Sequence, residues 1–422
     1  MSFQQGLSGL AAAATALDVI GNNVANASTV GFKSSNANFS DVFAASLGIV
    51  GASQVGAGVS VSAIQQRFSQ GNPTTTNNSL DLAINGDGFF RMSDDGAISY
   101  TRNGQFHLDK EGYVVNDQQL RLTGYPAGVN GQISQSSPVE LQLSASQIPP
   151  RATSDPLSGN LGAVLNLDSR DTVPLVAAFD PADPGSYNFS TALTVFDTLG
   201  VSHNLSTYYV LQPPAVPPAG NKWDVYATLD GANPVGAAVS FTTLEFTNTG
   251  TLIPPLAPPV PVLPDWDLSN GAVTPWSPGK MDFTGTTQFG SASTVDRLTQ
   301  GGYASGNLAG VGVGSDGILQ GRYSNGQTRS MGQLVLATFA DPNGLLNLGN
   351  NQWTATSVSG PELIGAPASG SRGVIQSAAV EASNVDLTQE LVAMITAQRN
   401  YQANAQTIKT QDQIMQTLIN LR

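Results

Sequence analysis

The segment that decides the fold is DLTQELVAMITAQRNYQANAQTIKTQDQIMQTLIN, residues 386–420, close to the C-terminal end of the 422-residue chain. Apolar residues recur in it at steps of three and four, interrupted at Gln398 and Asp412, which predicts an amphipathic α-helix. Asp386 and Gln389 predict a capped start, and no Gly or Pro follows. The helix would be roughly 50 Å long at about 1.5 Å per residue. Its apolar stripe consists of Leu387, Leu391, Met394, Tyr401, Ala405, Ile408, Met415 and Ile419.

A shorter helix of the same kind is predicted at the opposite end of the chain. Its apolar stripe consists of Phe3, Leu7, Leu10, Ala14, Leu17 and Val24. Because this helix is about two-thirds as long as the C-terminal one, it leaves much of the longer stripe uncovered within one chain. We therefore expect both stripes to form a coiled coil and a subunit interface with other copies of the chain. The alternative is a monomer in which the two helices pair only with each other as a stalk.

Charge is distributed unevenly along the chain. The formal net charge is −13, yet residues 1–36 and 386–422 each carry equal numbers of acidic and basic residues. The positions between the apolar residues of the C-terminal stripe are mostly Gln, Asn, Thr and Ala. Such side chains can be buried in hydrogen-bonded contacts at a lower cost than unpaired charges. This pattern favours end helices that are surrounded by copies of themselves.

Between the helices, the pattern changes to alternating short strands and turns, as in residues 89–115. Pro149-Pro150 suggests a boundary, and the proline runs at 213–218 and 254–264 predict exposed loops. The predicted fold class is mainly β, with two nested β domains and a coiled coil of terminal helices. The predicted domains are a helical core at 1–27 plus 384–422, extended linkers at 28–72 plus 364–383, an inner β domain at 73–147 plus 286–363, and an outer, variable β domain at 148–285.

The composition argues against several classes of enzyme. The chain has no Cys and only His107 and His203, so thiolate chemistry and multi-histidine metal sites are not expected. The G-x-G-x-x-G match at 312–317 precedes a predicted strand, not a phosphate-binding helix. We predict no catalytic, cofactor-binding or metal-binding residues. The negative charge argues against binding to nucleic acid. No apolar run is long enough for a membrane helix, so we expect no membrane insertion. The first basic residue is Lys33, so we expect no secretory leader.

Four segments resemble the flagellar rod and hook protein family. They are Ala16-Leu-Asp-Val-Ile-Gly-Asn-Asn-Val-Ala-Asn-Ala-Ser-Thr-Val-Gly-Phe-Lys33, Asp81-Leu-Ala-Ile-Asn-Gly-Asp-Gly-Phe-Phe90, Glu381–Leu391 and Ala397–Asp412. Residues from about 148 to 285 lie outside the resemblance. The signature residues that carry it are Asn22, Asn23, Asn26, Gly31, Phe32, Gly86, Gly88, Phe89, Asn384, Gln398, Arg399 and Asn400.

The resemblance implies a structural subunit of the bacterial flagellar hook, because distal rod proteins are shorter and lack the large insertion. It implies a flexible tubular homo-polymer that acts as a universal joint, located in the hook and basal body outside the cell. It also implies export through the flagellar type III pathway, and contact with hook cap, distal rod and hook–filament junction proteins. A distal rod subunit, a secreted β-rich adhesin and a secreted β enzyme are the alternatives. Since short helices are marginal in water, we expect disordered ends in the monomer, with Lys33, Arg399 and Lys409 open to trypsin.

Overall fold

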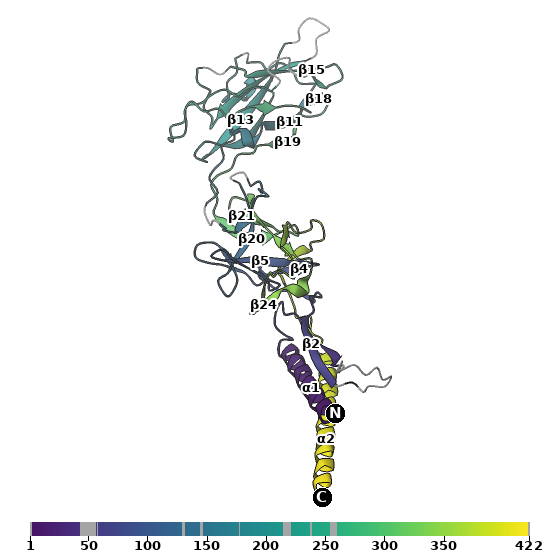
Figure 1. Cartoon of the computed structure of the whole chain (residues 1–422). Coiled ribbons are helices and arrows are strands. Elements are labelled where there is room, and N and C mark those ends of the chain that lie inside the picture. The colour runs from purple at the N-terminus through teal and green to yellow at the C-terminus, as the bar shows by residue number, and fades with distance from the viewer. Residues whose placement is uncertain are drawn as a thin grey trace. The chain divides into compact units, whose positions relative to one another are not determined.

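Helices form at both ends of the chain, as the apolar stripes predict. Helix α1 spans Ser2–Ala25, helix α2 spans Leu387–Asn420, and the two pack against each other (Figure 1). Asp386 caps α2, because its Oδ1 accepts hydrogen bonds from the backbone N–H of Thr388 at 2.9 Å and of Gln389 at 3.1 Å. The predicted fold class, mainly β with paired terminal helices, is confirmed.

The structure is a computed structural model that describes residues 2–42, 56, 58–128, 131–143, 147–176, 178–213, 221–236, 239–253 and 260–420. The chain divides into two compact units. The first unit comprises Met1–Ala145, Ala309–Arg322 and Thr328–Arg422, and the second comprises Ser146–Leu308 and Tyr323–Gln327. The second unit is therefore an insertion in the sequence of the first.

The first unit contains both helices and most of the short strands. Its strands are β1 (Ser35–Val42), β2 (Gly58–Gln66), β3 (Pro73–Thr75), β4 (Leu82–Asn85), β5 (Phe89–Asp94), β6 (Ala97–Thr101), β7 (His107–Leu108), β8 (Val114–Val115), β9 (Arg121–Pro126), β10 (Val139–Glu140), β20 (Leu308–Val313, which starts at the boundary), β21 (Ile318–Tyr323), β22 (Thr328–Leu334), β23 (Leu336–Thr338), β24 (Leu346–Gly349), β25 (Gln352–Thr354), β26 (Leu363–Gly365), β27 (Val374–Ser377) and β28 (Ala379–Glu381). Its main sheet has the order β20-β21-β22-β9-β5-β6-β25-β24. The predicted meander over 89–115 corresponds to β5 through β8.

The described residues of the second unit form two sheets. Its strands are β11 (Leu161–Asp168), β12 (Phe189–Phe196), β13 (Ser202–Leu211), β14 (Lys222–Leu229), β15 (Thr242–Phe246), β16 (Leu252–Ile253), β17 (Met281–Asp282), β18 (Thr287–Phe289) and β19 (Thr294–Thr299). Strands β12 to β16 form an antiparallel sheet in sequence order, and β11 pairs with β17, β18 and β19 in the other sheet.

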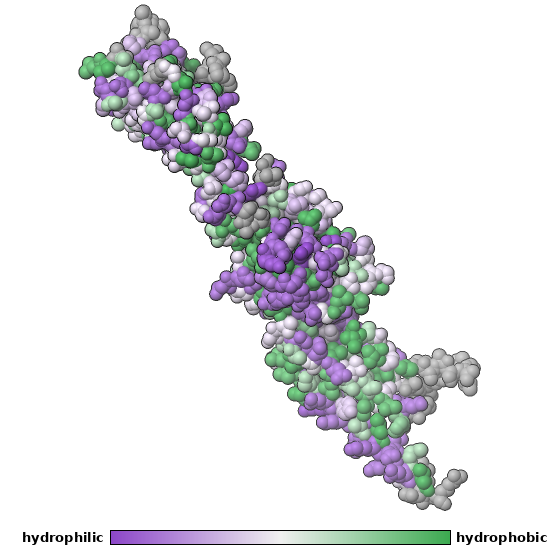
Figure 2. Space-filling view, turned by 90° about the vertical axis from the view of Figure 1, so that its left-hand side faces the viewer, coloured by the Kyte–Doolittle hydropathy of each residue, from purple (hydrophilic) through white to green (hydrophobic). Residues whose placement is uncertain are grey.

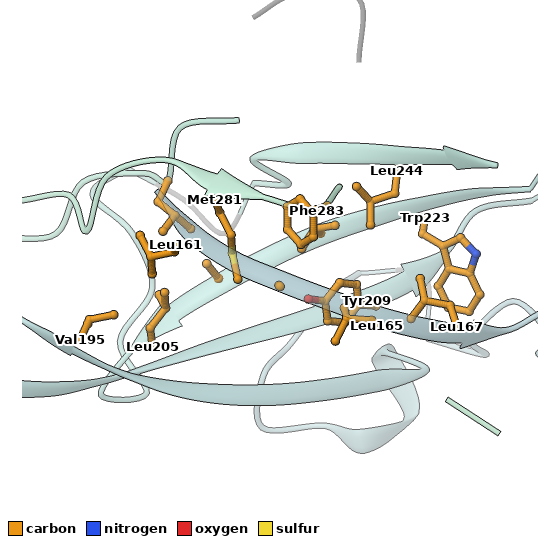
Figure 3. Close-up of a cluster of buried hydrophobic side chains, with 14 of the residues drawn as sticks. Leu161, Leu165, Leu167, Val195, Leu205, Tyr209, Trp223, Leu244, Met281 and Phe283 are labelled. Atoms are coloured by element: carbon orange, nitrogen blue, oxygen red, sulfur yellow. The ribbon is translucent and has the colours of Figure 1, made fainter. Parts of the chain in front are cut away.

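The core of the second unit consists of side chains from both sheets (Figure 3). Leu165 on β11 contributes from one sheet, and Leu205, Tyr209 and Trp223 contribute from the other, all with no exposed surface. Strand β13 alternates buried and more exposed residues along its length, as a strand with one buried face does. This unit therefore forms a closed apolar core within one chain.

The boundaries of the predicted domains differ from the units of the structure. We predicted that the outer domain ends at residue 285, but Thr287–Phe289 and Thr294–Thr299 pair with β11 of the second unit. The pairing partner lies more than a hundred residues earlier in the sequence, so local pattern could not show it. Residues 286–308 belong to the second unit.

The segments predicted as extended linkers are paired strands. Within 28–72, β1 and β2 form an antiparallel hairpin with a bulge at Asn38/Phe39. Within 364–383, β27 pairs with β4 and β28 pairs with β3. Cross-strand hydrogen bonds satisfy backbone groups that a free linker would leave to water.

The proline runs lie largely outside the described residues, which omit 214–220 and 254–259. Residues 260–264 are described, and the prediction of an exposed loop is wrong for part of them. Leu263 is 2% exposed and joins the core of the second unit, and Val262 forms a bridge with Lys280. Proline prevents a ladder hydrogen bond at its own position but does not prevent its neighbours from packing.

Candidate assembly site at the terminal helices

The contact between α1 and α2 is made by small residues, and we call it the seam. A Cβ atom on Gly9 would lie 2.8 Å from Oδ1 of Asn404, and one on Gly6 would lie 3.1 Å from Cγ1 of Ile408. The seam also places Asn404 and Ile408 on the half-buried face of α2. Glycine allows this close approach of two backbones because it has no side chain. The buried apolar residues of the two helices are alanines: Ala12, Ala13 and Ala397.

Only the start of the predicted stripe of α1 lies clear of the seam. Phe3 and Leu7 are 51% and 53% exposed. A rotation of 100° separates Leu7 from the seam residue Gly6, whereas Leu10 follows Gly6 by four residues and lies near the seam. Phe3 and Leu7 therefore remain available for contact after α1 and α2 have packed. Leu10, Ala14, Leu17 and Val24 are half-buried.

The predicted stripe of α2 is only partly covered by α1. Ile408 lies on the seam, whereas Leu387 and Leu391 near the start of α2 are 47% and 44% exposed. Near the end of α2, Met415 and Ile419 are 59% and 69% exposed. Apolar surface is visible over the terminal helices among polar surface (Figure 2). The remaining members are Met394, Ala405 and Tyr401, of which the first two are half-buried and the last is 37% exposed.

The hairpin of β1 and β2 occupies another face of α1. Gln5 donates from Nε2 to the carbonyl oxygen of Gly56 at 2.5 Å, and the N–H of Val59 donates to Oγ of Ser8 at 3.3 Å. Contacts thus cover the seam face and the hairpin face of α1. The face that carries Phe3 and Leu7 is left exposed.

Two signature asparagines join the helices to the strands. Asn23 is buried, and its side chain donates to the carbonyl of Ser35 at 2.8 Å and to Oε1 of Glu390 at 3.1 Å, while its Oδ1 accepts from the N–H of Ser35 at 2.9 Å. Asn384 accepts from the N–H of Ser34 at 2.7 Å and donates to the carbonyl of Arg67 at 2.8 Å. Each amide uses both its donor and its acceptor, so an aspartate at either position would lose a donor.

A buried ionic cluster lies next to these asparagines, and we call it the junction. Lys33 Nζ lies 2.6 Å from Oε1 of Glu381 and donates to the carbonyl of Ser69 at 2.8 Å. Arg102 lies 3.2 Å from Oε2 of the same Glu381. The N–H of Gly71 also donates to Glu381, at 2.8 Å. The junction thus ties the segment after α1 and the segment before α2 to the strand that ends near Arg102.

Burial controls the electrostatics of the junction. Removal from water lowers the pKa of Lys33, and the attraction of Glu381 opposes that effect without overcoming it. Burial likewise lowers the pKa of Arg102, against the same attraction. The side chains of Lys33, Arg102 and Glu381 are at most 3% exposed. Lys33 is therefore not accessible to trypsin in this structure, contrary to our expectation.

The signature residues around the junction have backbone roles. Gly31 has φ +69°, and a Cβ there would lie 2.5 Å from the backbone N of Asn103. Arg102 donates to the carbonyl of Gly86 at 2.9 Å and lies 5.3 Å from the ring centroid of Phe89. The remaining signature residues of these segments are Asn22, Asn26, Phe32 and Gly88. Asn26 donates to the carbonyl of Asn22 at 2.9 Å, and the carbonyl of Phe32 accepts from the N–H of Asn384 at 3.5 Å.

The other signature residues, Gln398, Arg399 and Asn400, are exposed on α2. Arg399 has no ion-pair partner in the part of the chain that is described. The structure therefore gathers Asn23, Asn384, Gly31, Gly86 and Phe89 around the junction but leaves these three outside it. The sequence reasoning missed Arg102 and Glu381 as functional residues. One signal was available, since Lys33 is the first basic residue of the chain and has few charged neighbours in the sequence.

Among the described residues, no group of His, Asp and Glu is arranged to hold a metal ion. None of the described helices has the length and apolar character needed to cross a membrane. The glycine motif begins on β20 and continues through a turn to Gly317, which precedes β21. It does not open a helix, so the phosphate-binding interpretation has no support in its local structure.

Comparison with known proteins finds matching family models along the chain. The Flagella basal body rod protein model matches residues 3–33, and the Flagellar hook protein FlgE/F/G D1 domain model matches 83–156. The Flagellar basal body protein FlaE D2 domain model matches 166–303, and the Flagellar basal body rod FlgEFG protein C-terminal model matches 376–421.

Full-length relatives give the same result. The flagellar hook protein FlgE of Escherichia coli (strain K12) is 43% identical over 432 residues, with 100% of both chains covered. The flagellar hook protein FlgE of Borreliella burgdorferi is 31% identical over 460 residues, with 100% of this chain and 99% of the relative covered. A crystal structure of the Helicobacter pylori flagellar hook protein FlgE2 matches with a TM-score of 0.51 at 12% identity, covering 73% of this chain and 100% of that one, and shows the similarity of fold.

Paired terminal helices with uncovered apolar faces, and β units built from the chain between them, define a structural subunit of a bacterial flagellar polymer. The full-length identities are more specific. The chain belongs to the flagellar hook protein FlgE family, and it is a structural subunit of the flagellar hook.

Proposed function

We propose that copies of this chain polymerise through α1 and α2 into a flexible tube that acts as a universal joint and transmits torque from the rod to the filament. The observation that supports this proposal is the exposure of Phe3, Leu7, Met415 and Ile419 after the two helices have packed. Burial of apolar surface contributes about 25 cal/mol per Å². Repeated along both helices, such burial would provide the adhesion between copies.

The β regions would provide the flexibility of the tube. We propose that the predicted inner and outer domains form separate layers and that their contacts between copies are weak and hydrated. The core of the second unit is complete within one chain, so this unit has no large buried cluster to share. Water-mediated contacts can break and re-form at low cost as neighbouring copies shift.

Other proposed properties follow from the class of protein. We propose export through the flagellar type III pathway without a cleaved signal peptide, and contact with the hook cap, the distal rod, the hook–filament junction proteins and the export apparatus. We also propose that the chain has no enzymatic activity and binds no nucleic acid and no cofactor. A net charge of −13 supports the exclusion of nucleic acid, because phosphate backbones repel such a chain.

Tube formation by the purified chain under salting-out conditions tests the proposed interface. The unchanged chain should give tubes of uniform diameter by electron microscopy. Leu7→Asp should give none, because the contact would bury an unpaired carboxylate at a cost of several kcal/mol. The circular dichroism of its monomer should be unchanged, since Leu7 is 53% exposed there.

Leu175→Asp is the matched control for Leu7→Asp. Leu175 is 100% exposed and belongs to the second unit, outside both terminal helices. Leu175→Asp should therefore keep the tubes. Tubes from Leu7→Asp that equal those of the control would show that this stripe is not the interface.

A further inference from the structure

Two opposite charges are left unpaired on the terminal helices. Asp18 is exposed and is the only charged residue of α1, and Arg399 is exposed on α2. Neither has an ion-pair partner among the residues that the structure describes. Arg399 also belongs to the family signature, yet it lies outside the junction. These two residues are therefore candidates for contacts with another chain.

Asp18 and Arg399 lie at nearly the same level along the helix pair. The two helices run in opposite directions, and Gly9 lies against Asn404 (Figure 1). Asp18 comes nine residues after Gly9, so it lies level with the residue nine positions before Asn404, which is residue 395. Arg399 is four residues from that position, or roughly 6 Å along the axis. Two copies placed side by side thus need little axial shift to bring Asp18 of one to the level of Arg399 of the other.

The two side chains project from opposite sides of the helix pair. Asp18 follows the seam residue Gly9 by nine residues, which is about two and a half turns, so it points away from α2. Arg399 precedes the seam residue Ile408 by nine residues and likewise points away from α1. The width of two helices, roughly 20 Å, separates the two charges within one copy. An ion pair between them therefore requires a second copy.

Each charge shares an exposed face with large apolar residues. On α1, Leu7 precedes Asp18 by about three turns, so the two share a face, and Leu7 is 53% exposed. On α2, Val392 and Ile395 precede Arg399 by seven and four residues and are 60% and 52% exposed. We call the first the acidic face of α1 and the second the basic face of α2. Both combine apolar surface with a single charge, and the two charges are opposite in sign.

We propose that the acidic face of α1 in one copy packs on the basic face of α2 in a neighbouring copy, and that Asp18 and Arg399 form an ion pair across this contact. The inference rests on the proposed polymerisation through the terminal helices and names the face that each helix uses. A charge removed from water without a partner would weaken such a contact, whereas the pair supports it. Because the two faces differ, each copy contacts one neighbour through each, and the contact repeats from copy to copy.

Charge reversal tests the ion pair in tubes assembled from the purified chain. Asp18→Arg and Arg399→Asp should each raise the protein concentration needed for tubes at least about tenfold, because two like charges then meet at the contact. The double variant Asp18→Arg with Arg399→Asp keeps the net charge of −13 and should assemble as the unchanged chain does. The circular dichroism of each monomer should be unchanged, since both residues are exposed.

Asp18→Arg combined with Lys409→Asp is the matched control. It also keeps the net charge, but Lys409 lies ten residues from Arg399, roughly 15 Å along α2. This control should assemble no better than Asp18→Arg alone. Recovery of tubes in the control to the level of the first double variant would overturn the inference, and so would single reversals without effect. Failure of the unchanged chain to form tubes would instead overturn the proposed function.

A cross-link tests the same contact without reversing a charge. Arg399→Lys keeps the positive charge and supplies an amine that a carbodiimide can couple to the carboxylate of Asp18. Tubes assembled from equal parts of isotope-labelled and unlabelled copies should give peptides that join Asp18 to position 399, with one labelled and one unlabelled partner, by mass spectrometry. Tubes without this cross-link would contradict the proposed contact. A cross-link whose two peptides always carry the same label would place the contact within one chain and would also contradict it.

Discussion

The second unit and the helix pair bury apolar residues in opposite ways. In the second unit, Tyr209, Trp223 and Phe246 are 0% exposed. In the helix pair, alanines are buried while large side chains such as Leu7 and Met415 remain more than half exposed. The second unit therefore has a core of large side chains within a single chain, whereas the helix pair buries only small apolar residues and leaves large ones exposed. The comparison identifies which part of a subunit is built for folding and which is built for assembly.

The small residues of the seam explain how one helix can serve both purposes. Gly6 and Gly9 bring α1 close to α2 without using a leucine. Isolated helices of this length are marginal in water, so the seam and the hairpin contacts hold α1 in place before assembly. Phe3 and Leu7 then stay available for copies of the chain.

The largest expected effect is at the junction, where the helix pair meets the β strands. Glu381→Ala would remove the carboxylate shared by Lys33 and Arg102 and leave two buried cations. We expect a loss of about 3–5 kcal/mol in the free energy of unfolding, because removing one partner of a buried pair leaves uncompensated charge. Urea unfolding followed by circular dichroism at the helix band would measure it.

Glu245→Ala is the control for that substitution. Glu245 also pairs with a lysine, Lys222, but the two side chains are 45% and 37% exposed. Its loss should cost about 0–1 kcal/mol, as for other exposed pairs. Equal effects of the two substitutions would mean that the junction does not hold the helices to the strands.

Three Leu→Ala substitutions sharpen the comparison itself. Leu165 is 0% exposed in the second unit, and Leu165→Ala should cost about 2–5 kcal/mol through the cavity it leaves. Leu175 is 100% exposed in the same unit, and its replacement should change stability by less than about 0.5 kcal/mol. Leu7→Ala should change monomer stability little but raise the protein concentration needed for tubes. Urea unfolding by tryptophan fluorescence and sedimentation of tubes would measure the two quantities.

The test is the order of the three changes in monomer stability. If Leu7→Ala destabilised the monomer as much as Leu165→Ala, the face of α1 that carries Leu7 would already be used within the chain. The contrast between a folded unit and an assembling helix pair would then be wrong.

Local signals in the sequence were sufficient for the helices and the first meander. Asp386 marks the start of α2, and the steps of three and four mark both helix faces. The pattern could not show which of two adjacent faces of α1 packs on α2. A stripe of leucines is the usual choice, yet the close approach uses Gly6 and Gly9, whose lack of side chains carries no hydrophobic signal.

The junction could not be predicted, because its members are distant in the sequence. Lys33 and Glu381 are 348 residues apart, and Arg102 and Glu381 are 279 apart. No local period links such positions. The same limit applies to β18 and β19, whose place in the second unit depends on pairing with β11.

The smallest predicted effect is a pH dependence confined to the second unit. Nδ1 of His203 lies 2.7 Å from Oδ2 of Asp230, and Nε2 lies 3.3 Å from Oδ2 of Asp197, which also accepts from Asn270 at 2.5 Å. Burial lowers the pKa of His203, but the hydrogen bonds to Asp230 and Asp197 outweigh burial and leave the pKa raised. The folded state therefore binds this proton more tightly than the unfolded state.

The sign of the effect follows from that raised pKa. The stabilisation is complete below the unfolded pKa of about 6.5 and is lost as pH rises through the folded pKa. The melting temperature of the second unit should fall over this range in the unchanged chain, and His203→Gln should flatten the slope. His107→Gln is the control, because His107 is 45% exposed and lies 4.0 Å from Asp117. If the slope of melting temperature against pH persisted in His203→Gln and was lost in His107→Gln, the assignment of the effect to His203 would be wrong.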